Sequence, residues 1–176
     1  FDAHVHLHDE RLDGCRDEVL AAAAAAGVTA ACCCGGSPAD WEALARLAAR
    51  PSPLRLLPAY GVHPWHVGDL PPDWLERLEQ RLLADPRAAV GEIGVDGVRR
   101  DVPGDLQRVV LRAQLELAAR LRRPVVLHGA RAWGALCEAL APHAARLPAF
   151  MAHAFAGSAE ILGQLVGWGG YVSFAG

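Results

Sequence analysis

The stretch DLQRVVLRAQLELAARLRRPVVLHG (105–129) carries the clearest fold signal in the chain. Its first part repeats apolar residues at steps of four, three, four and four, which predicts one buried face of a helix. These residues are Leu106, Val110, Ala113, Leu117 and Leu121. Asp105 is expected to cap this helix and Pro124 to end it. The apolar run PVVLHG (124–129) then predicts a buried strand directly after the helix.

The same alternation of apolar runs and helical segments extends in both directions. Further strands are predicted at 1–7, 28–35, 54–64, 88–96, 148–155 and 169–176. Helices are predicted at 16–26, 37–50, 74–84, 131–141 and after Ser158, with Ser37 and Ser158 as N-caps. Repeated strand–helix units predict parallel strands joined by right-handed crossovers. Two α/β architectures fit, a doubly wound open sheet and a (β/α)8 barrel, and the lack of a glycine-rich phosphate fingerprint weakens a nucleotide-binding sheet.

Composition limits the class of protein. A chain of 176 residues suits one domain over 1–176, and no apolar stretch is long enough for a membrane span. The net charge of −3 argues against generic binding to a phosphate backbone. The chain starts at Phe1 without Met or a leader, so the true start is expected to be missing and a cytoplasmic location is the default. The triplet Cys32, Cys33 and Cys34 is interpreted as buried strand and not as a metal site.

Unusual polar residues lie near the carboxyl ends of four predicted strands, where (β/α)8 barrels build their active sites. They are His4, His6, Glu92, His128 and His153. His4 and His6 are two apart and share one face of a strand. Imidazole and carboxylate groups suit Zn, Mn, Fe or a related divalent ion, and this set is too large for one tetrahedral ion, so a pair of metals is predicted. Because the chain has no Lys that could be carboxylated, Glu92 is the candidate bridge. The alternative is that each histidine is structural.

Six segments, in order, resemble the TatD-like family of metal-dependent hydrolases (deoxyribonucleases), within the amidohydrolase-like barrels. They are FDAHVHL (1–7), GVHPWH (61–66), VGEIGVD (90–96), VVLHG (125–129), MAHAFAGS (151–158) and GGYVSFAG (169–176). The resemblance implies two divalent ions, of Zn, Mg or Mn. It assigns one ion to His4, His6 and Glu92, and the other to Glu92, His128 and His153.

The resemblance also places His63 near the substrate phosphate, and the alternative is that His63 caps a turn before Pro64. Asp2 is a candidate for orienting one of the strand 1 imidazoles. Arg99, Arg100 and Arg131 are candidate phosphate contacts, whose alternative is a solvated surface. The remaining interpretations concern three residues: Trp65 is expected to be packed, although it could stack a base; His8 is assigned to the loop surface; and His143 is expected to be exposed.

One feature departs from the family. The family follows its seventh strand with an eighth that carries an aspartate, and this chain ends at Gly176 before such a strand. We therefore expect a barrel truncated after the seventh strand, with open edges that a second chain could cover. Three functions remain open: a phosphodiesterase acting on DNA through a metal-activated water, an amide, ester or lactone hydrolase of small molecules, and a metal-binding domain that lacks its catalytic aspartate.

Overall fold

The computed structural model describes residues 1–174 as a parallel sheet of seven strands, ordered β1 to β7. The strands are β1 (Asp2–Val5), β2 (Ala30–Cys34), β3 (Arg55–Tyr60), β4 (Ala89–Asp96), β5 (Val125–Ala130), β6 (Phe150–Ala152) and β7 (Tyr171–Val172). Each strand pairs in parallel with the next strand along the chain. This order is that of repeated strand–helix–strand units with parallel strands, as the sequence predicted.

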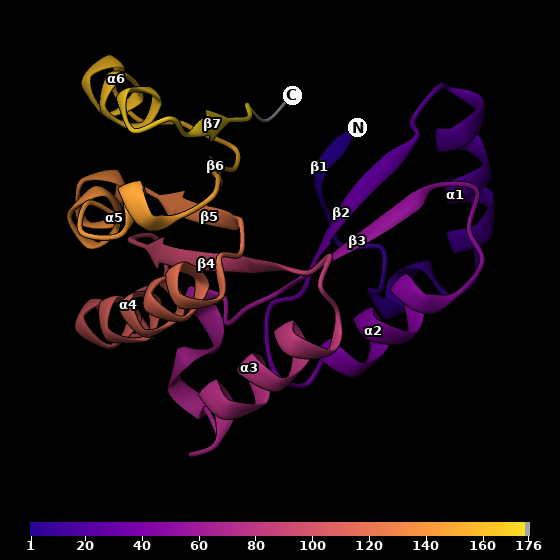
Figure 1. The fold of residues 1–176 in the computed structure, drawn as a ribbon, viewed down its shortest axis with the longest axis horizontal. Coiled ribbons are helices and arrows are strands. Elements are labelled where there is room, and N and C mark those ends of the chain that lie inside the picture. The colour runs from indigo at the N-terminus through magenta and orange to yellow at the C-terminus, as the bar shows by residue number, and fades with distance from the viewer. Residues whose placement is uncertain (175–176) are drawn as a thin grey trace.

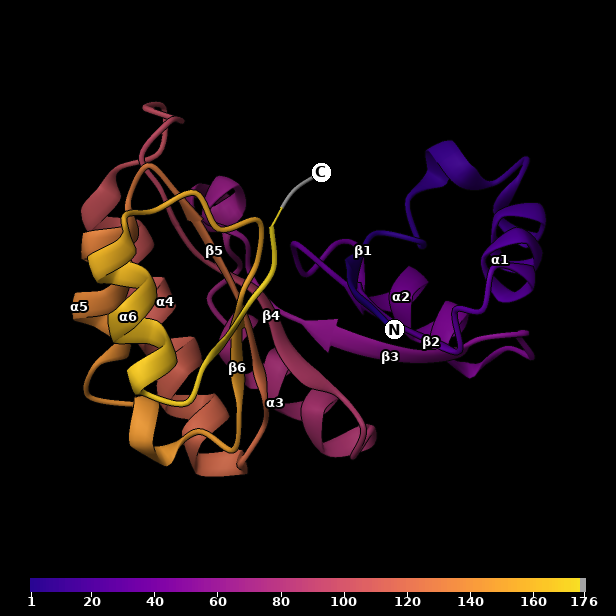
Figure 2. The ribbon, with the colours of Figure 1, turned by 90° about the horizontal axis from the view of Figure 1, so that it is seen from above.

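The helices cover the outer face of the sheet. They are α1 (Arg16–Ala25), α2 (Trp41–Ala49), α3 (Trp74–Ala84), α4 (Gly104–Leu121), α5 (Trp133–Leu140) and α6 (Ala159–Gly167), with 3-10 turns η1 (Glu10–Leu12), η2 (Pro64–Asp69) and η3 (Ala144–Arg146). The sheet is curled (Figures 1 and 2), and β1 and β7 are its two edge strands. The fold is therefore the predicted (β/α) barrel type, with seven strands among residues 1–174.

The core has two unequal parts, one on each face of the sheet. The larger part lies between the sheet and the helices and includes Cys33, Leu111 and Leu127. A smaller cluster contains Cys32 and Cys34 with Ala59, Ala89 and Val126. Successive residues of β2 thus pack on opposite faces, and all five are buried. The interpretation of the cysteine triplet as buried strand is confirmed.

Two predicted caps are wrong. The helix expected from Ser37 begins only at Trp41, because residues 37–40 form a turn in which the Asp40 nitrogen donates to the Ser37 carbonyl at 3.1 Å. Asp105 lies inside the first turn of α4, which follows Pro103. The Ser158 cap is confirmed, since its side chain accepts from the nitrogen of Ile161. Of the predicted last strand, Tyr171–Val172 pairs with β6, and residues 175–176 lie outside the described part.

The buried face of α4 includes Val110 and Leu117, as predicted, but it is wider than the predicted one. Leu106, expected in the core, is 37% exposed, whereas Gln107 and Gln114 are buried. Gln107 is hydrogen-bonded to the main chain of Asp96 and Gln114 to that of Val62, so burying these two glutamines costs little. Among the described residues, no helix combines the length and the apolar character that a bilayer crossing requires.

Candidate metal centre

The carboxylate of Glu92 lies at the centre of the predicted site. Glu92 is on β4 and is only 3% exposed. Its Oε2 is 2.7 Å from His4 Nε2 and 3.7 Å from His6 Nε2. Its Oε1 is 3.0 Å from His128 Nδ1 and 3.9 Å from His63 Nε2. Each carboxylate oxygen therefore faces two imidazoles.

Burial by itself would raise the pKa of Glu92, but the hydrogen bonds to His128 and His4 hold it well below its usual range. The carboxylate is therefore ionised. In the contacts with His4 and His128, a proton lies between an imidazole nitrogen and a carboxylate oxygen. The imidazole nitrogens and the ionised carboxylate gathered here are the donors that a divalent cation requires, so the residues present fit a metal.

His6 is oriented as a metal ligand would be. It follows β1 by one residue, and its Nδ1 donates to the carbonyl of Cys34 at 2.6 Å. A neutral imidazole with its proton on Nδ1 keeps a free lone pair on Nε2, and this Nε2 faces Glu92. Burial first, and then the neighbouring His4, lower the pKa of His6, which favours this neutral form.

His63 has the opposite tautomer. Its Nδ1 accepts from the nitrogen of Trp65 at 3.2 Å, so His63 caps η2. Burial lowers the pKa of His63 to about 3, which keeps the ring neutral with its proton on Nε2. His63 therefore caps the turn, as its alternative interpretation had it, and its Nε2 lies 3.9 Å from Glu92 Oε1 in the site. The contact to a substrate phosphate stays a prediction.

Asp96, at the end of β4, fixes His128 and was not assigned a role from the sequence. Its Oδ2 is 3.1 Å from His128 Nε2 and accepts from Trp65 Nε1 at 2.6 Å. Its Oδ1 accepts from the nitrogens of Val98 and Arg99. Burial would raise the pKa of Asp96, yet these donors lower it to about 2. A carboxylate that holds the far nitrogen of an imidazole is typical of metal-ligating histidines.

Among the described residues, two groups bring their ligand atoms within 4.8 Å of one another: His4, His6 and Glu92, and His63, Glu92 and His128. The first group is the predicted one. His153 belongs to neither group. Its ring stacks on His4 with centroids 3.6 Å apart, and its Nδ1 lies 3.3 Å from Ser173 Oγ. Burial, followed by His4, lowers the pKa of His153 to about 4. In the structure, His63 and not His153 completes the second group with Glu92 and His128, while His153 lies against His4 of the first group.

These side chains line a cavity of about 710 Å³ at the carboxyl ends of the strands. Trp65 lies on its wall and is 44% exposed, so the expectation that Trp65 is packed is wrong. The predicted arginines do not line the cavity. Arg99 pairs with Asp101 and lies over the Trp65 ring, and Arg100 and Arg131 are exposed.

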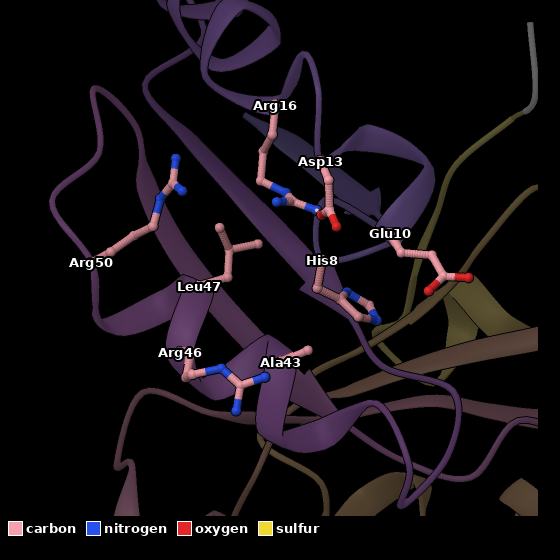
Figure 3. Close-up of a pocket in the computed structure, with 8 residues that line it drawn as sticks. All are labelled: His8, Glu10, Asp13, Arg16, Ala43, Arg46, Leu47 and Arg50. Carbon is pink, nitrogen blue, oxygen red and sulfur yellow. Dashed lines mark hydrogen bonds and ion pairs between the residues drawn. The ribbon is translucent and has the colours of Figure 1, made fainter.

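Three other predicted positions differ from expectation. Asp2 Oδ1 accepts from the main-chain nitrogen of His4 rather than holding an imidazole. The side chain of His143 is 12% exposed and lies 3.5 Å from Glu116, so it is not a free surface group. His8 is 7% exposed at its side chain, because it packs near Asp40 between the main cavity and a second one of about 310 Å³. Figure 3 shows His8, Arg16 from α1 and Leu47 from α2 lining this second cavity.

Main-chain contacts hold the loops that carry the site. The carbonyl of Gly35 accepts from the Glu92 nitrogen, and the carbonyl of Gly36 accepts from the His63 nitrogen. Gln114 bonds both main-chain groups of Val62, and Gln107 does the same for Asp96. The sequence signal that could have identified these hydrogen bonds is the presence of Gln107 and Gln114 within the apolar face of the helix.

Comparison with known proteins agrees with the geometry. A sequence profile described as TatD related DNase matches residues 1–176. The chain is 28% identical, over its whole length and 68% of the relative's, to an uncharacterized metal-dependent hydrolase (YabD) of Bacillus subtilis. It is 34% identical, over 72% of its length and 49% of the relative's, to a 3'-5' ssDNA/RNA exonuclease TatD of Yersinia pseudotuberculosis.

Among solved structures, the TatD homologue YjjV of Escherichia coli K12 superimposes with a TM-score of 0.88 and 31% identity, over 97% of this chain and 66% of that one. A TatD family hydrolase of Entamoeba histolytica shares the fold, with a TM-score of 0.87 at 21% identity, over 98% of this chain and 64% of that one. The chain thus spans about half to two thirds of the length of these relatives. Divalent metal use is supported by the ligand groups around Glu92. The chain belongs to the TatD related DNase family.

Proposed function

We propose that this chain carries the metal centre of a phosphodiesterase that acts on single-stranded nucleic acid. The observation that carries the proposal is the position of Glu92, whose two carboxylate oxygens each face two imidazoles. A buried carboxylate of this kind is suited to bridge two cations. The similarity to a 3'-5' ssDNA/RNA exonuclease of Yersinia pseudotuberculosis supports the substrate class.

In this proposal, His4, His6 and Glu92 hold one divalent ion, and Glu92, His128 and His153 hold the other, each being Zn, Mn or Mg. The ions would supply Lewis-acid polarisation of a phosphoryl oxygen and a hydroxide at neutral pH. Asp96 accepts the Nε2 proton of His128 and so leaves Nδ1 for a ligand bond. His6 is prepared in the same way by the carbonyl of Cys34.

His63 has a different role in the proposal. Because its Nδ1 accepts from a main-chain N–H, its Nε2 proton is available to a phosphoryl oxygen beside Glu92. A neutral donor at this position stabilises the charge that develops on the phosphate oxygens during attack by water. Of the candidate arginines, we propose Arg99 as a contact to the remainder of the substrate, since it lies over Trp65 at the cavity wall.

The bridging role of Glu92 is tested by metal content. Removing a group that only orients a ligand typically costs 10- to 100-fold in metal affinity, so loss of a shared ligand is expected to cost more than about 100-fold at both sites. Chelator-treated Glu92→Gln protein, titrated with Zn²⁺ or Mn²⁺, should bind neither ion tightly, whereas His153→Ala should lose mainly one. Glu116→Gln is the matched control, because Glu116 is an exposed carboxylate paired with Arg146. Two tightly bound ions in Glu92→Gln would contradict the proposal.

Turnover tests the substrate class. The metal-loaded chain should release nucleotides from single-stranded DNA or RNA, and His63→Ala should raise KM or lower kcat with its metal content unchanged. Cleavage of amide, ester or lactone substrates without cleavage of nucleic acid would overturn the proposed substrate. Metal binding without any turnover would overturn the proposed activity for this chain.

A further inference from the structure

Trp65 presents an open aromatic surface inside the cavity of the metal centre. Trp65 lines this cavity together with Glu92 and His128, and it is the large aromatic side chain of the lining. Its exposed fraction of 44% contrasts with Trp41, which is 1% exposed in the core. Large aromatic residues are highly buried on average, so an exposed one at the wall of a site is informative.

The orientation of the Trp65 ring is fixed by contacts with Asp96 and His63. Its Nε1 donates to Asp96 Oδ2 at 2.6 Å, and Asp96 is itself buried and held by the nitrogens of Val98 and Arg99. The edge of His63 meets the ring with centroids 4.8 Å apart and planes at 79°. A ring held in this way has little conformational freedom to lose when a ligand stacks on it.

Charge next to the ring favours a nucleotide over an uncharged aromatic ligand. The guanidinium carbon of Arg99 lies 5.3 Å from the Trp65 centroid, and the side chain is 43% exposed. The centroid of the His128 ring is 6.4 Å from that of Trp65. The Trp65 ring is thus close both to a partly exposed guanidinium, which also pairs with Asp101, and to the metal-ligand cluster.

We propose that Trp65 forms a nucleobase subsite, on which the unpaired base of the nucleotide next to the scissile phosphate stacks. This inference rests on the proposed function and specifies how that site recognises its substrate. Base–aromatic stacking tolerates any base and requires that the base be free of a duplex, which matches a single-stranded substrate. Asp96 is a positioning residue in this arrangement, because one carboxylate oxygen aligns both the stacking ring and His128.

The test removes the base and the ring separately and together. Binding of the metal-loaded chain to labelled oligothymidylates with phosphorothioate linkages, which resist hydrolysis, is followed by fluorescence anisotropy. Each oligonucleotide has one abasic residue at a different position. A stacked base contributes about 1–3 kcal/mol, which corresponds to about 5- to 140-fold in Kd. The wild-type chain should lose at least about fivefold at one position.

In Trp65→Ala, binding should be weakened by a similar factor and should no longer depend on the position of the abasic residue. Val109→Ala, which removes an exposed apolar side chain from α4, is the control and should bind like wild type. Two outcomes would overturn the subsite alone. In one, the affinity of Trp65→Ala still depends on the position of the abasic residue. In the other, the wild-type chain binds the intact strand but loses no affinity at any abasic position. A wild-type chain that binds no strand would overturn the proposed function as well.

A second measurement covers the case in which Trp65→Ala does not fold. Trp65→Phe keeps an aromatic ring and loses the N–H donor to Asp96. Stacked bases quench indole fluorescence, so an intact strand should quench wild-type fluorescence and should quench that of Trp65→Phe much less. Equal quenching in the two proteins would contradict the proposal, because it would assign the contact to another tryptophan.

Discussion

Strands β4 and β5 approach each other at Gly94, which is paired with His128. A Cβ added at Gly94 would overlap the carbonyl oxygen of His128 and come within 2.8 Å of its carbonyl carbon and 2.9 Å of its nitrogen. All three are main-chain atoms, so no side-chain rotation can relieve the clash. Gly94→Ala must therefore separate the two strands that carry Glu92 and His128.

Overpacking in a core typically costs about 1–3 kcal/mol, and a clash with the main chain belongs at the upper end, about 3 kcal/mol. For a chain of this length, such a loss lowers Tm by about 6–12 °C. We also expect weaker metal binding, because the 3.0 Å contact between His128 Nδ1 and Glu92 Oε1 depends on the same strand spacing. Thermal unfolding and metal titration measure the two effects.

Gly163→Ala is the matched control, because a Cβ at this position in α6 meets nothing within 4 Å. Alanine in a helix interior is more favourable than glycine by about 0.5–1 kcal/mol, so this variant should be slightly more stable than wild type. A Gly94→Ala protein with unchanged Tm and unchanged metal affinity would refute the assignment of Gly94 as the contact that sets the spacing of the two strands.

Three further predictions concern support outside the metal centre. Gln114→Leu leaves the main-chain N–H and C=O of Val62 unpaired and should destabilise the chain by about 2–4 kcal/mol in urea unfolding; a neutral effect would show that these bonds are replaceable. Burial lowers the pKa of His143 despite the nearby Glu116. As pH drops through about 6.5, the imidazole is therefore protonated in the unfolded chain before it is protonated in the folded one, and the free energy of unfolding falls. His143→Asn should flatten this dependence between pH 8 and 5, and an unchanged slope would contradict the assignment. Ser158→Ala should cost about 0.5–1 kcal/mol, at the low end for a cap because its hydrogen bond is 3.4 Å long, and a loss near 2 kcal/mol would contradict this estimate.

The repeat of strands and helices was predictable because its signals are local. Periodic apolar residues predicted α4, and short apolar runs predicted β4 and β5, within a few residues of their observed ends. The burial of two glutamines in α4 was not predictable in this way. Gln107 and Gln114 are buried because Asp96 and Val62, which lie 11 and 52 residues away, present main-chain groups to them.

The candidate site shows the same division. The presence of His4, His6, Glu92 and His128 around one cavity was predictable, because alternation along a strand and the shared edge of parallel strands place such residues together. The stacking of His153 on His4 was not predictable, since it is a contact between side chains that are far apart along the chain.

The sequence by itself determined the family of fold, the chemistry of the donor atoms and the end of the barrel at which they gather. The tertiary structure decided which imidazole nitrogen carries a proton. The Cys34 carbonyl fixes it for His6, and the Trp65 nitrogen fixes it for His63. It also decided that Asp96 aligns Trp65 with His128. The physical reason is that periodicity and residue type are properties of neighbours along the chain, whereas a tautomer, a pKa or a ring orientation is set by whichever polar atoms folding brings within hydrogen-bond distance.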